Sequence, residues 1–389
     1  MITVLGTPVP PGGAQRLASA TLVVGAVRHL STVDGAAERL VLGDVAAAVA
    51  RLAAHDGPAV VLASGDPGFF GIVRALRAAG LDVEVLPAPS SVAVAFARLG
   101  LPWDDALVVS AHGRSLRPVV NACRAHRKVA VLTGPGAGPA ELGAALAEVP
   151  RRLVVAERLG ATDERMTETI PAEAAGREWR EPNVVLVLGA DPVAPAPGWI
   201  AGNPPTPVGW ALPEVAFAHR DSMITKAEVR AVALARLGPR LGDLVWDIGA
   251  GSGAVAVECA RFGAAVVAVE RDPVACKAIE ANAESHAVDF AVVEASAPGC
   301  LAELPDPDAV FVGGGGLAVL RACADRRPSR LVAAFAAVER VGPALVALAA
   351  AGYDAEGVQL QANRLTPLPD GSHRLAAVNP VHLVSGRLK

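Results

Sequence analysis

The feature that most constrains this chain is a glycine-rich turn near its centre, LVWDIGAGSGAVAVECA, at residues 244–260. The apolar run before the glycines predicts a strand, and the alanine- and valine-rich run after them predicts a helix. The glycines allow a tight turn and let the backbone approach a ligand, whose polar groups then meet free N–H donors at the start of the helix. Such a unit normally opens a nucleotide-binding domain, so we expect another domain to fill the preceding half.

The pattern of apolar runs predicts two α/β domains. The chain has 389 residues, which is long enough for two hydrophobic cores. Residues 191–213, DPVAPAPGWIAGNPPTPVGWALP, are too rich in proline to sustain a helix or a central strand, so they read as a linker. The predicted domains are therefore residues 1–190 and residues 214–389.

Within both domains, short β-rich runs alternate with alanine-rich segments of helical period, such as GAAERLVLGDVAAAVARLAA at 35–54. Continuous apolar strands separated by helices predict parallel sheets covered on both faces. The N-terminal runs are ITVLG, TLVVG, AVVLAS, VEVLPA, ALVVSA, KVAVLT, RLVVAE and NVVLVLG. The C-terminal runs are LVWDIG, AAVVAVE, DFAVVEA, DAVFVGG and RLVAAFA.

Composition and charge limit the possible partners. The chain is 52% hydrophobic and 19% charged with a net charge of -4, which gives no general attraction to nucleic acid or to an anionic membrane. The longest apolar stretch, 341–353, is shorter than the roughly 18 residues of a spanning helix. No secretory signal is visible at the N-terminus, so we expect a cytoplasmic protein. The five scattered cysteines predict neither disulfides nor a metal site.

The central glycine turn is compatible with two cofactors. Gly249, Gly251 and Ala254 satisfy the dinucleotide pattern, which leaves an NAD-dependent oxidoreductase open. Asp247 can accept a hydrogen bond from a cofactor ammonium group, and Glu270 can accept from both ribose hydroxyls, which favours S-adenosylmethionine (SAM). The residues predicted to line this SAM pocket are Asp247, Gly249, Ala250, Gly251, Ser252, Gly253, Glu270, Ser296 and Ala297.

The segment before this turn, HRDSMITKAEVRAVALARLG, predicts a helix. Thr225 and Glu228 have the spacing of a capping box, in which the threonine hydroxyl accepts from the first-turn N–H groups and the glutamate reaches back. Val229, Ala233 and Leu237 then follow at helical spacing.

Four C-terminal motifs carry a family resemblance. MITKAEVRA, WDIGAGSGAVAVE, AVERDP and DAVFVGGGG together resemble the SAM-dependent methyltransferase and decarboxylase domain of the precorrin-6Y C5,C15-methyltransferase family of cobalamin biosynthesis, over about residues 214–389. The resemblance implies a Rossmann-like class I methyltransferase fold, with Thr225, the glycine turn, Glu270 and Ala297 lining the SAM pocket. The family usually has an acidic residue where this chain has Ser296.

The N-terminal half carries a second set of motifs. LASGDPGFFG, at 62–71, follows a strand; Gly65 and Gly68 permit an unusual backbone, and Asp66 can bind N–H or hydroxyl groups. With LPAPSSVAVAFARLGLPWDD, VSAHGR, VAVLTG, AERLG and NVVLVLG, it resembles the cobalamin-pathway C5-methyltransferase branch of the tetrapyrrole methylase family, over residues 1–190. The family's first-strand loop usually carries a second glycine where this chain has Pro8.

This second resemblance implies that SAM lies between two α/β lobes. The implied SAM contacts are Ser64, Gly65, Asp66, Phe69, Ser90 and Ser91. His112 and Arg114 would face the macrocycle. Ser90 and Ser91 can also serve as helix N-caps, and His112 can also be a loop histidine bonded to the backbone.

Together the resemblances imply one bifunctional enzyme with two SAM sites. It would methylate precorrin-6B at C5 and C15 and decarboxylate the C12 acetate, giving precorrin-8. It would work as a homo-oligomer, a dimer or a tetramer. Substrate carboxylates need cationic partners, for which the candidates, each equally explained as a surface charge, are Arg28, Arg114, Arg220, Lys226 and Arg230. A tetrapyrrole carrier without turnover stays the non-enzymatic alternative.

Overall fold

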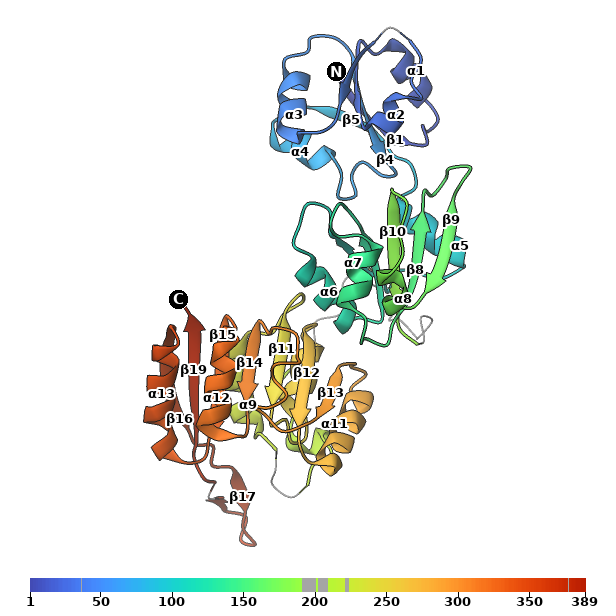
Figure 1. The fold of residues 1–389 in the computed structure, drawn as a ribbon. Helices are drawn as coiled ribbons and strands as arrows, with labels where there is room; N and C mark the ends of the chain where they lie inside the picture. The colour runs from blue at the N-terminus through green and yellow to red at the C-terminus, as the bar shows by residue number, and fades with distance from the viewer. Residues whose placement is uncertain (36, 191–200, 202–208, 221–223, 377) are drawn as a thin grey trace. The chain divides into compact units, whose positions relative to one another are not determined.

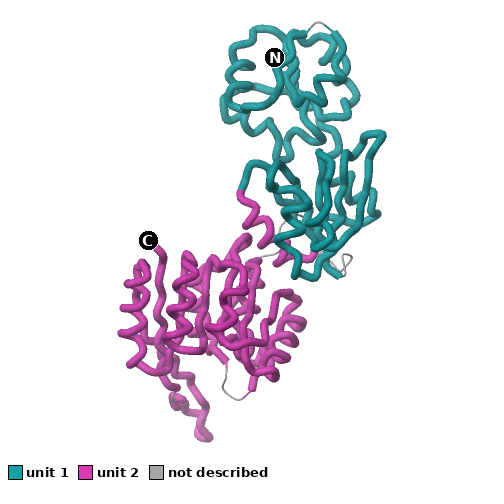
Figure 2. The backbone as a smooth tube through the Cα atoms, viewed as in Figure 1, with its two compact units in different colours: residues 1–114, 128–202 teal, residues 115–127, 203–389 magenta. Residues whose placement is uncertain are grey.

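The computed structural model describes residues 1–35, 37–190, 201, 209–220, 224–376 and 378–389. The chain divides into two compact units, residues 1–114 with 128–202 and residues 115–127 with 203–389 (Figure 2). The helix α6 (Leu116–Ala125) belongs to the second unit by this division. The predicted linker falls largely outside the described residues, and the predicted domain boundaries stay a prediction.

The first lobe of unit 1 is a parallel sheet with the strand order β3-β2-β4-β1-β5 (Figure 1). Its interior is formed by buried aliphatic residues of β1, β2 and β4 with Leu76 of the helix α4. Its elements are β1 (Ile2–Thr7), α1 (Gly13–Ser19), β2 (Leu22–Gly25), α2 (Val27–Leu30), β3 (Glu38–Val41), α3 (Val45–Ala53), β4 (Ala59–Ser64), α4 (Val73–Ala78) and β5 (Val83–Leu86). The next helix, α5 (Ser91–Leu99), packs against the strands of the second lobe.

One part of the predicted helical stretch at 35–54 is a strand. Residues 38–41 pair with 22–25 as the edge strand β3, and the helix α3 begins only at Val45. Asp44 is the N-cap of α3, because its side chain accepts from the N–H groups of Ala46 and Ala47. The alanine-rich composition therefore predicted a helix that is longer than the observed one.

The second lobe of unit 1 has the strand order β6-β7-β10-β8-β9. Only β6 and β7 are parallel, and the other three pairings are antiparallel. The prediction of a parallel sheet is therefore wrong for this lobe, because strands buried on both faces, such as the wholly buried β10, do not reveal their direction. Its elements are β6 (Leu107–Ser110), β7 (Lys128–Leu132), α7 (Pro139–Ala145), β8 (Arg152–Glu157), β9 (Arg165–Thr169), α8 (Pro171–Ala175) and β10 (Asn183–Leu188).

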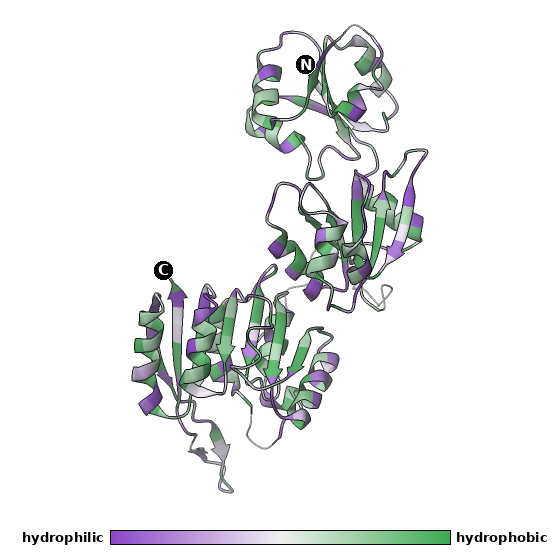
Figure 3. Cartoon of the chain, viewed as in Figure 1, coloured by the Kyte–Doolittle hydropathy of each residue, from purple (hydrophilic) through white to green (hydrophobic). Residues whose placement is uncertain are grey.

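Unit 2 is built on a seven-stranded sheet with the order β13-β12-β11-β14-β15-β19-β16. The five strands from β13 to β15 are parallel, as predicted, and β19 inserts antiparallel between β15 and β16. Buried aliphatic clusters lie on both faces, and the central strands are the most hydrophobic part of the sheet (Figure 3). The order reverses at β11, which lies between β12 and β14. Ligands of open α/β sheets bind at such a point.

The elements of unit 2 beyond α6 follow in chain order. They are η1 (Glu214–Ala216), α9 (Ala227–Leu237), β11 (Leu244–Ile248), α10 (Ala254–Arg261), β12 (Ala265–Glu270), α11 (Pro273–Ser285), β13 (Ala291–Glu294), β14 (Ala309–Val312), α12 (Gly316–Asp325), β15 (Arg330–Phe335), η2 (Val338–Arg340), α13 (Val341–Ala350), β16 (Tyr353–Leu360), β17 (Leu365–Pro367), β18 (His373–Leu375) and β19 (Val381–Leu388). None of the described helices has the length and apolar character needed to cross a bilayer.

A buried arginine fastens the start of unit 2 to its sheet. Arg230 of α9 is fully buried, pairs with the buried Glu258 of α10, and lies 4.9 Å from the centre of the Phe217 ring. Its guanidinium also donates to the carbonyl groups of Leu212 and Thr225. The Leu212 N–H donates to Glu258 at 2.7 Å. The prediction of Arg230 as a substrate contact or surface charge is wrong, because the side chain is fully buried and each of its three nitrogens donates inside the protein.

The helix α9 begins differently from the prediction. Lys226 is the N-cap residue, and no side chain of a capping box bonds there. Instead, Glu214 of η1 accepts from the Ala227 N–H at 3.1 Å, and Glu228 pairs with Arg364. Arg364 also makes a two-pronged pair with Glu214, which together with the other hydrogen bonds lowers the pKa of Glu214 to about 2. A carboxylate from another segment has replaced the expected local cap.

Candidate functional site

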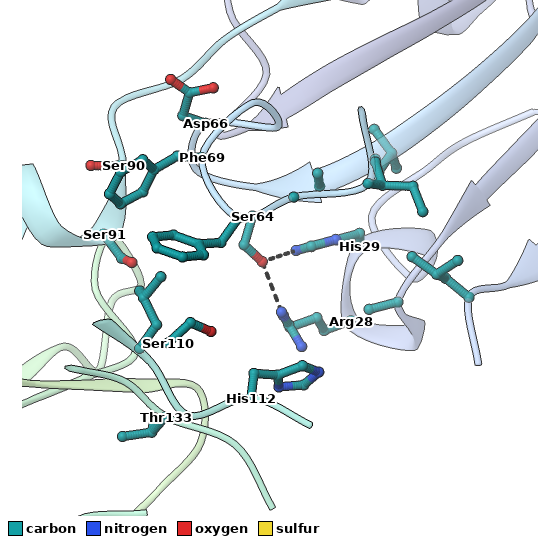
Figure 4. Close-up of a pocket in the computed structure, with 18 of the residues that line it drawn as sticks. Arg28, His29, Ser64, Asp66, Phe69, Ser90, Ser91, Ser110, His112 and Thr133 are labelled. Atoms are coloured by element: carbon teal, nitrogen blue, oxygen red, sulfur yellow. Dashed lines mark hydrogen bonds between the residues drawn. The ribbon is translucent and has the colours of Figure 1, made fainter. Parts of the chain in front are cut away.

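Unit 1 contains a cavity of about 380 Å³. It is lined by the ends of β2 and β4 in the first lobe, by the loop before α5, and by the segments after β6 and β7 in the second lobe (Figure 4). Of the residues predicted for this half, the cavity is lined by Ser64, Asp66, Phe69, Ser90, Ser91, His112 and Arg114. Gly65 is not among the lining residues, and its predicted contact with SAM stays a prediction.

Close backbone packing shapes the first-lobe wall of the cavity. A Cβ atom at Gly6 would lie only 2.3 Å from the Gly65 carbonyl oxygen and 2.4 Å from the Ala88 nitrogen. Glycine at this position therefore brings the ends of β1, β4 and β5 together. Asp66 accepts from the Gly68 N–H at 2.8 Å, which fixes the turn that follows β4.

Ser90 caps the helix α5 and also lines the cavity, and its predicted contact with SAM stays a prediction. Its hydroxyl accepts from the Ala93 N–H at 3.2 Å, so Ser90 is the N-cap of α5, and the same residue lines the cavity. Ser91 begins the helix beside it and also lines the cavity. The start of α5 is thus held rigidly at the cavity wall.

A hydrogen-bonded cluster of three side chains lies on the first-lobe wall. Arg28 donates to the Ser64 hydroxyl at 2.8 Å, and His29 Nε2 lies 3.2 Å from the same hydroxyl (Figure 4). Burial, and next the charge of Arg28, lower the pKa of His29. Arg28 was predicted as a carboxylate contact, whereas His29 was missed. The available signal was its position directly after β2, whose end lies beside that of β4.

The charge of the cavity lining is predominantly positive. Arg28 comes from the first lobe and Arg114 comes from the second; Asp66 is the only carboxylate among the lining residues. His112 and Arg114 are exposed, so their side chains are free to meet a ligand. A cavity lining with more positive than negative side chains suits a ligand that carries carboxylates.

In unit 2, the glycine turn lies at the strand-order reversal. The N–H groups of Gly249 and Ala250 donate to the Val269 carbonyl at 2.9 and 3.1 Å, which ties the turn to the end of β12. Gly249 has a φ of 70°, and a Cβ there would lie 2.8 Å from the Gly314 nitrogen. Only glycine allows the loops after β11 and β14 to approach so closely.

Asp247 lies below this turn with one oxygen unpartnered. Its Oδ2 accepts from the Ala256 N–H at 2.9 Å, and its buried Oδ1 has no hydrogen-bond partner among the described residues. Burial, and then the nearby Glu270 carboxylate, raise the pKa of Asp247 to about 7. A buried acceptor without a donor indicates a bound donor in the working state, such as an ammonium group or a water molecule.

Glu270 ends β12 beside the turn, as predicted. One oxygen accepts from the Gly251 N–H at 2.9 Å, and the other accepts from the N–H groups of Arg271 and Asp272 at 2.9 and 3.1 Å. The Ala295 N–H donates to the Glu270 carbonyl at 3.0 Å, so the segment carrying Ser296 and Ala297 lies next to Glu270. The predicted carboxylate and the predicted adenine edge are thus brought together. This geometry fits the ribose and adenine portions of SAM.

Asn282 of α11 is a further residue that the sequence did not indicate. Its amide donates to the Ser252 carbonyl at 2.8 Å and to the Ala218 carbonyl at 2.8 Å, and it accepts from the Ala218 N–H at 2.7 Å. It therefore joins the glycine turn to the segment before α9. A single asparagine in an amphipathic helix gives no sequence signal for such a role.

The remaining predicted contacts of unit 2 lie nearer the surface. Arg220 is exposed and lies 3.5 Å from Asp272, the N-cap of α11. The Thr225 carbonyl accepts from Arg230, and Lys226 is the N-cap residue of α9. The pocket and substrate roles of Arg220, Thr225 and Lys226 stay predictions.

The described residues contain no group of histidine, cysteine or carboxylate side chains suited to a metal ion. All five cysteines are free, and four of them are buried.

Two family models match separate parts of the chain. The tetrapyrrole (corrin/porphyrin) methylases match residues 9–175, and the precorrin methyltransferase domain matches residues 215–384. The chain is 39% identical over 318 residues to a precorrin-6Y C(5,15)-methyltransferase [decarboxylating] of Sinorhizobium sp, covering 78% of this chain and 74% of that protein.

Two relatives match shorter parts of the chain. A probable cobalt-precorrin-6B C(15)-methyltransferase (decarboxylating) of Pyrobaculum calidifontis is 35% identical, over 45% of this chain and 94% of its own length. A cobalt-precorrin-7 C(5)-methyltransferase of Salmonella typhimurium is 33% identical, over 48% of this chain and 98% of its own length.

Proposed function

Because this chain belongs to the family of decarboxylating precorrin-6Y C5,15-methyltransferases of cobalamin biosynthesis, we propose that its two halves divide the reaction between them. The N-terminal half methylates C5, and the C-terminal half methylates C15 and releases carbon dioxide. The observation that carries this proposal is the presence of two separately built candidate SAM sites, a cavity in unit 1 and a glycine turn in unit 2. The single-activity relatives, each matching just under half of this chain, support the division.

The proposed substrate is precorrin-6B and the proposed product is precorrin-8. When bound, SAM supplies an electrophilic methyl group to a nucleophilic meso carbon. The protein's contribution is to align the two and to exclude water. In the N-terminal half, Arg28 and Arg114 provide the positive charges that would hold acetate and propionate groups, and His112 can hydrogen-bond to them.

In the C-terminal half, the residues present fit SAM. Asp247 Oδ1 would accept from the ammonium group, Glu270 would accept from the ribose hydroxyls, and the segment at 295–297 would face the adenine. Decarboxylation breaks the bond between the C12 acetate methylene and its carboxylate. The conjugated macrocycle takes up the electron pair, a proton replaces the carboxylate, and carbon dioxide leaves.

The experiment that tests the proposal is mass spectrometry of precorrin-6B incubated with the purified full chain and SAM labelled with ¹³C in its methyl group. We expect a product with two labelled methyl groups and one carbon dioxide fewer, and NMR should place the label at C5 and C15. An unchanged macrocycle, with SAM binding shown by calorimetry, would contradict the assigned substrate.

Calorimetry also separates the competing hypotheses. Two SAM equivalents per chain support the proposal, whereas binding of one NAD equivalent would support an oxidoreductase, and macrocycle binding without turnover would support a carrier. The cytoplasmic location and the homo-oligomer, dimer or tetramer, are part of the same proposal and can be checked by cell fractionation and by light scattering.

A further inference from the structure

Methylation of a meso carbon requires a base that removes the hydrogen of that carbon, and the proposed function does not yet assign one. The C5 position of the substrate carries one hydrogen. When its electron pair forms the new bond to the methyl group, the sulfur–carbon bond breaks and positive charge spreads over the macrocycle. The C5–H bond must then break, so that its electron pair restores the conjugation. A base near the carbon has to accept that proton.

We propose that Ser64 and His29 form a proton relay that accepts this proton in the N-terminal cavity. The inference rests on the proposed function, since it assigns C5 methylation to this half. Ser64 Oγ would take the proton from the carbon while the Ser64 hydroxyl proton passes to His29 Nε2. The imidazolium then returns the proton to solvent, so the relay ends as it began.

The hydrogen bonds of Ser64 support this direction of transfer. Arg28 donates to Ser64 Oγ at 2.8 Å, so that oxygen acts as an acceptor toward Arg28 and its own proton is free. In the tautomer that carries its proton on Nδ1, His29 Nε2 lies 3.2 Å from Ser64 Oγ and can accept that proton. The Thr7 hydroxyl donates to the Ala63 carbonyl and lies 3.3 Å from the same nitrogen, so its oxygen can accept from Nε2–H once the ring has taken up the proton. Ser64 is exposed to the cavity, and His29 is half-buried behind it (Figure 4).

The surroundings keep His29 ready to accept a proton. Arg28 is its charged neighbour on α2, Asp66 lies on the loop after β4, and His112 and Arg114 face the cavity from the second lobe. The predominance of positive groups disfavours a second positive charge on the imidazole. Burial and Arg28 accordingly lower the pKa of His29, so its neutral form is the resting form at pH 7.

The first test measures C5 methylation by the full chain under single-turnover conditions between pH 5 and pH 8. For His29→Gln and Ser64→Ala, we expect a loss of about 100-fold at pH 7. In the wild type the rate falls on the acid side, where His29 becomes protonated, and His29→Gln should abolish that fall. Arg28→Gln removes the charge that lowers the pKa of His29, so the acid limb should move to higher pH.

The second test does not depend on methyl transfer. Precorrin-6B is incubated with the full chain in D₂O without SAM, and exchange of the C5 hydrogen is followed by NMR. In this assay a deuteron takes the place of the methyl group: the deuterated Ser64 hydroxyl delivers it to C5, and Ser64 Oγ then accepts the C5 hydrogen as the conjugation is restored. The relay therefore predicts exchange with the wild type and loss of exchange with either variant. Circular dichroism identifies variants that have failed to fold. Ser64→Ala should fold normally even if His29→Gln does not, because the Ser64 side chain is exposed.

His55→Gln is the matched control. His55 Nε2 lies 2.8 Å from the Thr21 hydroxyl in the same lobe, so it is a histidine–hydroxyl pair away from the cavity lining. It should keep both wild-type activities. The relay would be overturned if His29→Gln kept the pH profile and the hydrogen exchange of the wild type. It would also be overturned if His29→Gln lost rate but kept that profile and that exchange. If the wild type itself failed to methylate C5, the proposed function would fall, and the exchange assay would still decide the relay.

Discussion

The two candidate sites differ in whether they are formed by one local segment of backbone or by side chains from distant segments. The site of unit 2 is formed mostly by backbone at one local turn, with Asp247 and Glu270 placed by adjacent strands. The cavity of unit 1 is formed by side chains from segments as distant as Arg28 and Thr133. A site made of local backbone should fail when one glycine is changed. A site made of dispersed side chains should lose its functions one at a time.

The largest expected effect is that of Gly251→Arg. Gly251 has a φ of 57°, and its N–H donates to Glu270, so a side chain there both strains the backbone and fills the turn. We expect SAM binding at this site, C15 methylation and decarboxylation to fall below detection, while C5 methylation remains. Labelled-methyl NMR of the product checks this.

The control for this change is Gly352→Arg. Gly352 has a φ of 90° in the turn before β16, and a Cβ there would have no neighbour within 4 Å. It should leave both methylations intact. Loss of C5 methylation in a correctly folded Gly251→Arg protein would show that the two sites do not act independently.

The second effect is a pH dependence confined to the C-terminal site. The pKa of Asp247 is raised to about 7, and only the ionised carboxylate attracts an ammonium group. SAM affinity at this site should therefore fall as pH drops below about 7, approaching tenfold per pH unit. Calorimetry of the wild type, compared with Gly251→Arg, isolates the site. In Asp247→Asn this pH dependence should disappear, and an unchanged slope would show that another group titrates.

The third effect concerns stability. The pKa of Glu214 is depressed to about 2 from the ordinary 4.5, so its contribution is fully present above pH 4.5 and is lost as pH falls toward 2. Because the Arg364 side chain is 50% exposed and solvent screens the pair, we expect Glu214→Gln to cost about 1–2 kcal/mol at pH 7. Urea unfolding at pH 7, 5 and 3.5 measures this difference, which should narrow only at the lowest pH.

Glu168→Gln in unit 1 is the matched comparison. The Glu168 side chain is 57% exposed and pairs with Arg152, so removing this carboxylate should cost less than about 0.5 kcal/mol. Equal losses for the two variants would contradict the role of Glu214 as a partly buried cap and ion-pair partner.

The smallest expected effect is that of Ser90→Ala. It removes the N-cap of α5, which should cost about 1 kcal/mol, while the other cavity contacts stay in place. Hydrogen exchange of the Ala93 amide should speed up by about fivefold. Ser90→Asp should restore the slow exchange, because aspartate also caps helices. Unchanged exchange in Ser90→Ala would show that the cap contributes little.

The same contrast explains what the sequence could predict. The glycine turn, Asp247 and Glu270 were predictable because a strand, a turn and a helix are adjacent in the chain, and their strand ends meet in a parallel sheet. The segment at 295–297 followed for the same reason. The helix cap at Ser90 and the turn at Asp66 were also predictable, because each is a local feature, whereas the contacts of both residues with SAM stay predictions.

The rest depended on tertiary contacts. His29 reaches Ser64, 35 residues away, only because β2 and β4 are neighbours. The cap of α9 comes from Glu214, 13 residues before Ala227, so the local capping signal was misleading. Strand direction in the second lobe was also hidden, since burial on both faces is compatible with either direction.

The anchoring of Leu212 has a practical consequence for dividing the chain. Leu212 bonds through both its N–H and its carbonyl to the buried pair of Glu258 and Arg230. A gene fragment that starts after this residue would leave a fully buried guanidinium and carboxylate short of partners. Separate expression of the C-terminal half should therefore begin upstream of Leu212.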